Sequence, residues 1–316
     1  MTAAFTFPGQ GSQAVGMGKA LAEAFPAARA VFDEVDAALG EKLTAIIWEG
    51  PAETLQLTEN AQPALMAVSV AVMRVLEAEA GVDLKRDAKF VAGHSLGEYS
   101  ALAAAGALGL SDAARLLKLR GQAMQKAVPV GVGAMAALLG PDLEQVQKIA
   151  RQAADDTKLV CGVANDNSPG QVVVSGAKEA VERAIAIATE QGVKRSVMLP
   201  VSAPFHCALM QPAADAMEEA LAKATIKQPA VPVVANVTAQ PVSDAATIAK
   251  LLVQQVTATV RWRESILAMK ALGVTKMYEL GAGKVLAGLV KRIDKELEAS
   301  SVGAPADVEV ALKALS

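Results

Sequence analysis

The chain has 316 residues, of which 53% are hydrophobic and 20% are charged, and its formal net charge at pH 7 is −3. This length and apolar content allow a substantial core, built as one large domain plus a smaller one. Binding to DNA or RNA needs a surplus of lysine and arginine, so the slight acidity argues against a nucleic-acid partner. No basic segment followed by an apolar run opens the chain, and its longest apolar stretches are too short or too rich in Gly and Pro to cross a bilayer. We therefore expect a cytoplasmic protein without membrane contact.

Strands and helices alternate from the first residues, which is typical of a mainly parallel sheet covered by helices. The first elements predicted are a strand at 4–7, helices at 26–39 and 61–80, a strand at 89–92, and helices from 98 and from 111. The alternation resumes late in the chain with a strand at 231–237, helices within 244–272, a strand at 276–280 and a final helix from 284. We predict that 1–130 and 200–316 form one α/β domain.

The segment between these two parts has a different order of predicted elements. Its predicted elements are a strand at 134–139, a helix at 142–154, strands at 159–164 and 171–175, a helix at 177–191 and a strand at 194–198. This βαββαβ order is that of the ferredoxin-like arrangement. We therefore predict an inserted, ferredoxin-like subdomain over 131–199.

A Gly-x-Ser-x-Gly motif lies between the predicted strand at 89–92 and the helix from 98. It reads Gly93-His-Ser-Leu-Gly97. In α/β enzymes this pattern places a strained serine at a helix N-terminus with its hydroxyl exposed, and the glycines remove clashing Cβ atoms. Ser95 is thus a candidate nucleophile, although the same pattern also occurs in ordinary strand-to-helix turns.

The chain has only two histidines, His94 and His206. A serine hydroxyl needs a neighbouring base, which is usually histidine. His94 adjoins Ser95 on a sharp turn, so its side chain should point away from the hydroxyl, and His206 is the candidate base. No acidic residue between them stands out as a third member, so a backbone carbonyl or a side-chain amide could orient the imidazole.

The two cysteines, Cys161 and Cys207, lie far apart in the sequence and form no Cys-x-x-Cys motif. Together with only two histidines they are too few for a typical zinc site. We predict no metal site and no disulfide, and we interpret Cys207 as a small buried hydrophobic residue.

Arg120 interrupts the apolar side of the amphipathic helix predicted from 111, close to Leu116, Leu117 and Met124. An arginine at this position could bind an anion, or it could extend its charge to solvent from the edge of the face. The residues alone leave both interpretations open.

Four segments of the chain share one resemblance. They read FPGQGSQ at 7–13, GHSLGEYS at 93–100, LRGQAM at 119–124 and PFHC at 204–207. Together they resemble the malonyl-CoA:acyl carrier protein transacylases of fatty-acid synthesis, and the similarity extends over essentially the whole chain. The resemblance implies an α/β-hydrolase-like enzyme, which we expect to be monomeric. It would bind no cofactor and would transfer malonyl from malonyl-CoA to the phosphopantetheine thiol of acyl carrier protein.

The resemblance also implies catalytic roles for individual residues. Ser95 would attack the thioester carbonyl, and His206 would take its proton and return it to the departing thiolate. The backbone N–H groups of Gln10 and Leu96 would form the oxyanion hole. The backbone carbonyl of Gln255 would orient the imidazole in place of a carboxylate.

By the same resemblance, Arg120 would bind the malonyl carboxylate through a two-pronged, charge-assisted hydrogen bond, with Met124 nearby in the substrate site. The ring of Phe205 would restrict room beside the α-carbon of the acyl group. Carrier proteins are typically acidic, and a docking patch is predicted from four basic residues of the final predicted helix: Lys284, Lys291, Arg292 and Lys295. A solvated helix face explains the same four residues equally well.

Three alternatives remain at this point. A serine esterase or thioesterase could use Ser95 and His206 to release acyl groups to water, but it would have no use for Arg120. An acyltransferase that loads a polyketide carrier would be chemically identical. A noncatalytic docking subunit would have lost the nucleophile or the base, and this chain retains both.

Overall fold

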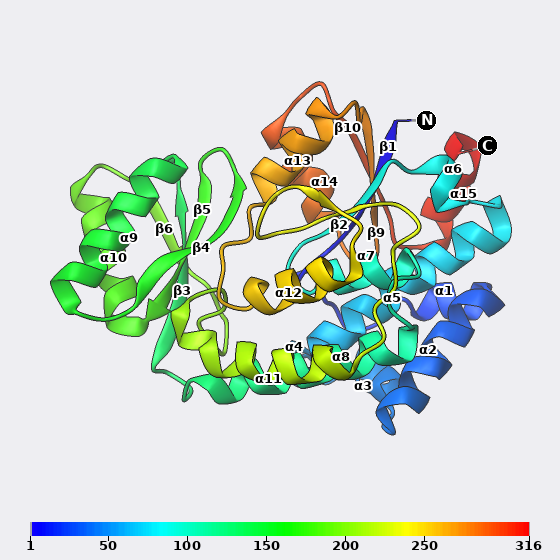
Figure 1. Cartoon of the computed structure of the whole chain (residues 1–316), viewed down its shortest axis with the longest axis horizontal. Helices are drawn as coiled ribbons and strands as arrows, with labels where there is room; N and C mark the ends of the chain where they lie inside the picture. Colours follow the sequence, from blue (N-terminus) through cyan, green and yellow to red (C-terminus); the bar gives the residue numbers. More distant parts are fainter. Residues whose placement is uncertain (1, 316) are drawn as a thin grey trace.

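Two β-sheets organise the computed structural model, which describes residues 2–315 (Figure 1). The larger sheet has the order β10-β9-β1-β2-β7-β8, and the smaller has the order β4-β5-β3-β6. The strands of the larger sheet are β1 (Ala3–Phe7), β2 (Phe90–Gly93), β7 (Val233–Val234), β8 (Pro241–Val242), β9 (Lys276–Leu280) and β10 (Glu298–Val302). All its pairings are parallel except that of β7 with β8. The prediction of an α/β fold with a mainly parallel sheet is confirmed.

Helices surround this sheet. They are α1 (Lys19–Ala24), α2 (Pro26–Leu39), α3 (Leu43–Glu49), α4 (Ala52–Gln56), α5 (Thr58–Ala80), α6 (Leu84–Asp87), α7 (Gly97–Ala104), α8 (Leu110–Ala127), α11 (Gln211–Lys223), α12 (Ala245–Gln255), α13 (Trp262–Ala271), α14 (Val285–Ile293) and α15 (Pro305–Leu315). A short 3₁₀ helix, Ala208–Met210, precedes α11.

Both faces of the larger sheet are buried, as a parallel sheet between helices requires. Side chains alternate along β1, so Phe5 and Phe7 pack in the core formed with α2, α5, α7 and α8. Ala4 points the other way, into a second core that includes Trp262 of α13 and Leu289 of α14. The sheet is therefore held from both sides, which gives its strand ends a fixed position.

Helix α5 is long and apolar enough, by length and composition, to cross a membrane. However, 83% of its most apolar window is buried inside the protein. Helices α2 and α8 pack against it, and its C-terminus is capped by Gly81 in the left-handed conformation. Helix α5 is therefore a central core helix of this fold.

The smaller sheet forms with two helices the part drawn at the left of Figure 1. Its elements are β3 (Gly133–Leu139), α9 (Leu143–Thr157), β4 (Cys161–Ser168), β5 (Gln171–Ala177), α10 (Lys178–Glu190) and β6 (Arg195–Met198). All its pairings are antiparallel, and the predicted βαββαβ order is confirmed. The domain limits at 131 and 199, and the likeness to α/β-hydrolases, stay predictions.

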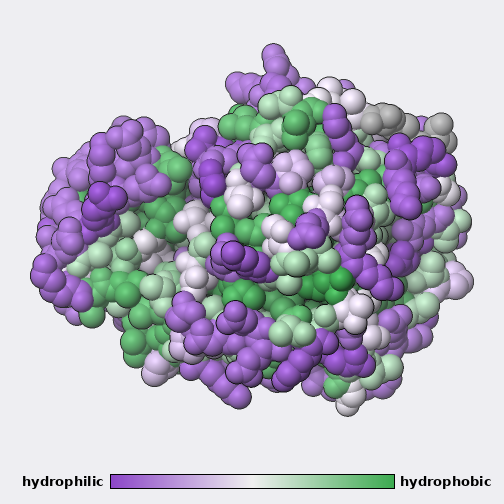
Figure 2. Space-filling model, in the orientation of Figure 1, coloured by the Kyte–Doolittle hydropathy of each residue, from purple (hydrophilic) through white to green (hydrophobic). Residues whose placement is uncertain are grey.

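Both faces of strand β3 are also in contact with apolar side chains. Ala136 and Leu138 pack against α9 and α10, whereas Met135 and Ala137 join the main core. Figure 2 shows hydrophilic residues over the outer side of this smaller part and apolar residues where it meets the rest of the molecule. The small sheet therefore faces the larger part with an apolar surface.

Two predicted elements differ from the structure. The helix predicted from 284 is present as α14 (Val285–Ile293), but the prediction that it is the final element is wrong, because Asp294 takes an extended backbone and β10 and α15 follow. The strand predicted at 231–237 pairs only at Val233 and Val234. Beyond them the chain turns, and Asn236 leaves the sheet to bond with the serine turn described below.

Candidate active site

The Gly-x-Ser-x-Gly motif forms a tight turn between β2 and α7. Ser95 has a φ of 53°, in the left-handed region that L-residues rarely occupy. A Cβ atom at Gly93 would lie 1.8 Å from the carbonyl oxygen of Gly97, and one at Gly97 would lie 2.2 Å from that of Phe7. Only glycine fits at either position. The two glycines therefore allow the turn to pack directly against the end of β1, with the Ser95 side chain facing away from the sheet.

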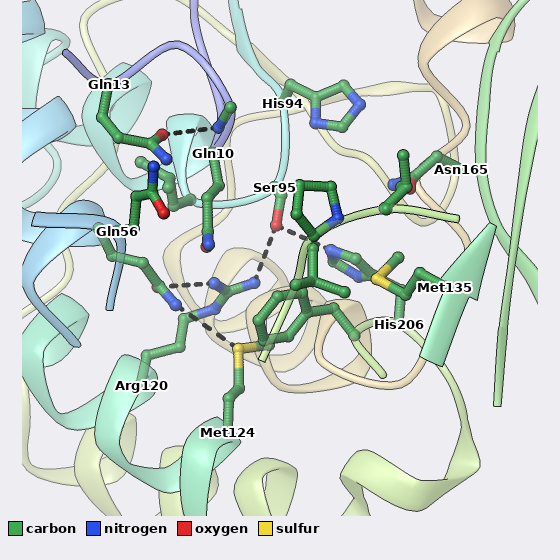
Figure 3. Close-up of a pocket in the computed structure, with 17 residues that line it drawn as sticks. Gln10, Gln13, Gln56, His94, Ser95, Arg120, Met124, Met135, Asn165 and His206 are labelled. Carbon is green, nitrogen blue, oxygen red and sulfur yellow. Dashed lines mark hydrogen bonds between the residues drawn. The ribbon is translucent and has the colours of Figure 1, made fainter. Parts of the chain in front are cut away.

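A cavity of about 480 Å³ opens beside this turn. Seven of the eight residues predicted for the site line it: Gln10, Ser95, Leu96, Arg120, Met124, Phe205 and His206. The eighth, Gln255, is fully buried behind them. Figure 3 shows that the smaller sheet contributes Met135 and Asn165 to the wall opposite Arg120. The cavity therefore lies between the two parts of the molecule.

Ser95 and His206 are directly hydrogen bonded. The Oγ atom of Ser95 lies 2.8 Å from Nε2 of His206, and Nδ1 of His206 lies 2.9 Å from the carbonyl oxygen of Gln255. Because that carbonyl can only accept, the proton is on Nδ1 and Nε2 is left as an acceptor. Burial first, and the charge of Arg120 second, lower the pKa of His206 to about 3. The imidazole is thus neutral near pH 7 and can take a proton from Ser95.

Arg120 projects from α8 into the same cavity, although its side chain is only 1% exposed. Its Nη1 donates to Oε1 of Gln62 at 2.7 Å, and its Nη2 donates to Oε1 of Gln255 at 2.9 Å and to Oγ of Ser95 at 3.2 Å. Within residues 2–315, these bonds go to amides and a hydroxyl and none goes to a carboxylate. Burial lowers the pKa of Arg120. A buried cation with only neutral partners is a suitable receptor for an incoming anion.

Two backbone donors face the cavity near Ser95. Leu96 precedes α7, and Gln10 follows β1, where its side chain accepts a hydrogen bond from Thr58 at 2.9 Å. No hydrogen bond among residues 2–315 engages the backbone N–H of Gln10 or Leu96. Both groups are free to bind a negatively charged oxygen.

His94 points away from the Ser95 hydroxyl, as its place on the turn predicts (Figure 3). Its Nε2 atom lies 2.8 Å from Oδ1 of Asn167, and its ring packs 5.6 Å from that of Trp262. Burial lowers its pKa. His94 therefore connects the serine turn to strand β4 of the smaller sheet.

Sequence reasoning missed part of the network behind Ser95. Oδ1 of Asn236 accepts from the backbone N–H of Ser95 at 2.8 Å, and its Nδ2 donates to the carbonyl of Gly93 at 2.7 Å. Glu98, Gln62 and the side chain of Gln255 also belong to this network and were not predicted from the sequence. A charged residue at the start of the largely apolar helix α7 was the available signal for Glu98. Gln62 lies among the polar residues that begin α5, so it stood out by no such signal.

The predicted basic residues and cysteines lie elsewhere. Lys284, Lys291, Arg292 and Lys295 are all exposed, although Lys295 lies beyond the end of α14. Cys161 and Cys207 are free, and the thiol of Cys207 donates to the carbonyl of Pro204 at 3.2 Å. Residues 2–315 contain no group of three or more His, Cys, Asp or Glu side chains placed to hold a metal ion.

Comparisons with known proteins agree with this geometry. The family model "Acyl transferase domain" matches residues 4–302. The chain is 47% identical to the malonyl CoA-acyl carrier protein transacylase of Bacillus subtilis (strain 168), over 99% of this chain and 96% of that protein.

Two solved structures are also similar over nearly their whole length. One is the acyl-carrier-protein-S-malonyltransferase from Bartonella henselae, which is 57% identical with a TM-score of 0.97, covering 100% of this chain and 99% of that one. The other is described as a type II PKS acyl-carrier protein in complex with its malonyl-transacylase. It is 43% identical with a TM-score of 0.94, covering 99% of both chains.

Proposed function

Because the chain belongs to the acyl transferase family, and within it to the malonyl CoA-acyl carrier protein transacylases, we propose that it transfers malonyl from malonyl-CoA to the phosphopantetheine thiol of acyl carrier protein. One observation carries the proposal. The Oγ atom of Ser95 lies 2.8 Å from the imidazole of His206 and 3.2 Å from the guanidinium of Arg120. A nucleophile, a base and a cation that suits the malonyl carboxylate thus meet at one oxygen. The product would supply extender units for fatty-acid synthesis.

In the first half-reaction Ser95 attacks the thioester carbonyl carbon while Nε2 of His206 takes the hydroxyl proton. The new Oγ–C bond forms, the C–S bond breaks, and the imidazolium gives its proton to the CoA thiolate. Two features support this role for His206. Its neutral form is favoured by burial and by Arg120, and the carbonyl of Gln255 holds the required tautomer.

The tetrahedral intermediate carries a negative oxygen, for which we propose the backbone N–H groups of Gln10 and Leu96 as ligands. Both residues line the cavity beside Ser95. Leu96 also lies at the N-terminus of α7, where the helix dipole favours negative charge. Removal of such a donor typically costs about 10² to 10³ in rate.

Arg120 is the proposed receptor for the free carboxylate of the malonyl group. Its partners Gln62 and Gln255 hold the guanidinium in the cavity wall, so a carboxylate can bind without first displacing a counter-ion. An acetyl group would leave this buried charge without an anion, which is unfavourable. Met124 and Phe205 line the same cavity, and the Phe205 ring would disfavour branched acyl groups.

In the second half-reaction the carrier thiol attacks the malonyl-serine ester, and His206 again moves the proton. Both thioesters contain pantetheine, so one site serves both steps. We propose that the reaction uses only groups of the protein and its substrates, and that the enzyme therefore holds no cofactor and works as a cytoplasmic monomer. For the acidic carrier we propose docking at the exposed residues Lys284, Lys291, Arg292 and Lys295. A carrier KM that is unchanged after charge reversal of Lys284 and Arg292 would reject this docking site.

Mass spectrometry of the intact protein after a short incubation with malonyl-CoA tests the proposal. The wild type should gain one malonyl group, and Ser95→Ala should gain none. Addition of holo acyl carrier protein should then move the group to the carrier. Accumulation of free malonate without transfer would instead identify a hydrolase.

A polyketide carrier is the second candidate acceptor. The observation in its favour is the similar solved complex described as containing a type II PKS acyl-carrier protein. Both carriers present the same thiol, so the cavity does not distinguish them. A comparison of kcat/KM for a fatty-acid carrier and a polyketide carrier from the same organism decides between them.

A further inference from the structure

Glu98 is a buried carboxylate directly behind the candidate nucleophile, and the mechanism above does not use it. It lies in the first turn of α7 and is 1% exposed. Its Oε2 atom accepts hydrogen bonds from Nε2 of Gln255 at 2.9 Å and from the backbone N–H of Asn236 at 3.0 Å. An apolar residue of similar volume would avoid the cost of burying this carboxyl group. Its partners therefore indicate what it contributes.

The first partner, Gln255, connects Glu98 to Arg120. Its Nε2 atom donates to Glu98 and to the carbonyl oxygen of Ser95 at 3.0 Å, and its Oε1 atom accepts from Arg120 at 2.9 Å. An amide has one donor end and one acceptor end. Because the groups around Nε2 can only accept, the oxygen of Gln255 must face the guanidinium. Of these acceptors, Glu98 is the one that carries charge when ionised, which makes its hydrogen bond the strongest.

The second partner, Asn236, connects Glu98 to the serine turn. Its backbone N–H donates to Glu98, while its side chain bonds the N–H of Ser95 and the carbonyl of Gly93. Oε2 of Glu98 thus accepts hydrogen bonds from both Gln255, which contacts Arg120, and Asn236, which contacts the backbone of Ser95. These contacts join residues 138 and 157 positions apart in the sequence.

We propose that Glu98 is a positioning residue for acyl selection, acting through the amide of Gln255 to hold Arg120 in the orientation that receives the malonyl carboxylate. The inference rests on the proposed function of Arg120. The Gln255 side chain carries this effect, whereas the backbone carbonyl of Gln255 orients His206 independently. Loss of Glu98 should therefore reduce the preference for malonyl more than it reduces the chemistry at Ser95.

The test is the ratio of kcat/KM for malonyl-CoA to that for acetyl-CoA, which does not depend on the fraction of active protein. Glu98→Ala should lower this ratio about tenfold, the equivalent of one misplaced hydrogen bond to a charged group. Glu98→Gln should restore the ratio to within about threefold, since its amide oxygen can occupy the place of Oε2. If Glu98→Ala does not fold, the volume-matched Glu98→Met serves as the variant without an acceptor.

Glu279 provides a matched control. It is also a buried carboxyl, 1% exposed, but it accepts from the backbone N–H groups of Leu286 and Ala287, outside the cavity. Glu279→Ala should lower the melting temperature and leave the malonyl-to-acetyl ratio unchanged. An equal fall of the ratio in Glu279→Ala, or an unchanged ratio in folded Glu98→Ala, would overturn the proposal.

A double-mutant cycle tests the route through Gln255. Gln255→Ala keeps the backbone carbonyl but removes the amide, and it should lower the ratio by itself. Adding Glu98→Ala to it should lower the ratio no further, whereas multiplied effects would show that Glu98 acts by another route. If the wild type forms no malonyl-serine, the proposed function fails. If it forms one and the cycle is multiplicative, only this inference fails.

Discussion

The two sheets of this protein differ in what they contribute to the cavity. The mainly parallel sheet, buried on both faces, carries Ser95 at the carboxyl end of β2, and helix α8 carries Arg120. The antiparallel sheet supplies lining residues such as Met135 and Asn165. His206 lies on the segment that returns from the small sheet to the large part, but Gln255 of the large part orients it. Changes in the large part should therefore affect chemistry, and changes in the small part mainly stability.

The largest effect is expected at His206. His206→Ala removes the proposed base, which is hydrogen bonded to Ser95, and malonylation of Ser95 should slow by about 10⁴-fold or more, as in serine hydrolases that lose a member of the triad. Rapid-quench mass spectrometry measures this rate. An unchanged circular dichroism spectrum is the required control. A fall of less than tenfold would mean that another group takes the proton.

Arg120→Ala should produce the next largest effect. Loss of one partner of a buried charge pair costs about 2 to 5 kcal/mol, so kcat/KM for malonyl-CoA should fall by roughly 30-fold to 5,000-fold. Activity toward acetyl-CoA should stay constant or rise, because no buried cation then lacks its anion. Steady-state kinetics with the two substrates measure the difference. Equal losses for both would assign Arg120 a structural role.

Glu98→Gln should change how stability depends on pH. Burial raises the pKa of Glu98 from 4.5 to about 7, against its hydrogen bonds and the Arg120 charge. The folded protein therefore holds a proton that the unfolded chain releases above about pH 4.5, and this stabilisation is lost as the pH rises through about 7. The free energy of unfolding of the non-titrating variant, taken relative to that of wild type, should therefore rise by on the order of 3 kcal/mol between pH 4 and pH 9. Urea unfolding at the two pH values measures it, and a constant difference would contradict it.

The smallest effect concerns the attachment of the small sheet. Asp166 of β4 is 1% exposed and bonds Arg263 of α13 at 2.9 Å. Asp166→Ala should lower the free energy of unfolding by about 2 kcal/mol. This is less than the loss expected when a fully buried ion pair is broken, because Arg263 is partly exposed. The rate of Ser95 malonylation should stay within a few-fold of wild type. Thermal unfolding provides the measurement. The exposed pair Glu144–Lys148 of α9 is the control, and Glu144→Ala should leave the melting temperature unchanged.

The sequence predicted those site residues that belong to short local patterns. The turn around Ser95 is defined by two glycines within five residues, and His206 followed from the scarcity of histidines. The roles of Glu98 and Asn236 were not predictable in this way, because their bonds join residues 138 or more positions apart. Nothing in the local sequence says which distant donor a buried carboxylate meets.

The predicted strands likewise depend on whether the local sequence alone indicates the structure. Buried strands such as β1 and β2 are almost entirely apolar and were recognised, as was the alternation of strands and helices. Strand β10 reads Glu-Ala-Ser-Ser-Val and is partly exposed at the edge of the sheet. Val302, its last residue, is the only one of the β-branched and aromatic residues typical of strands that it contains. Only its pairing with β9 makes it a strand.

Ser95 and His206 share one backbone feature, a positive φ of 53° and 56° respectively. Each position would suit glycine better than any residue with a Cβ atom, and each such conformation costs about 1 to 3 kcal/mol. A chain selected only for thermal resistance would therefore place glycine at 95 and 206. The two side chains of the proposed chemistry are thus retained although their backbone conformations destabilise the folded state. A glycine variant at either position would resist heat better but would be inactive.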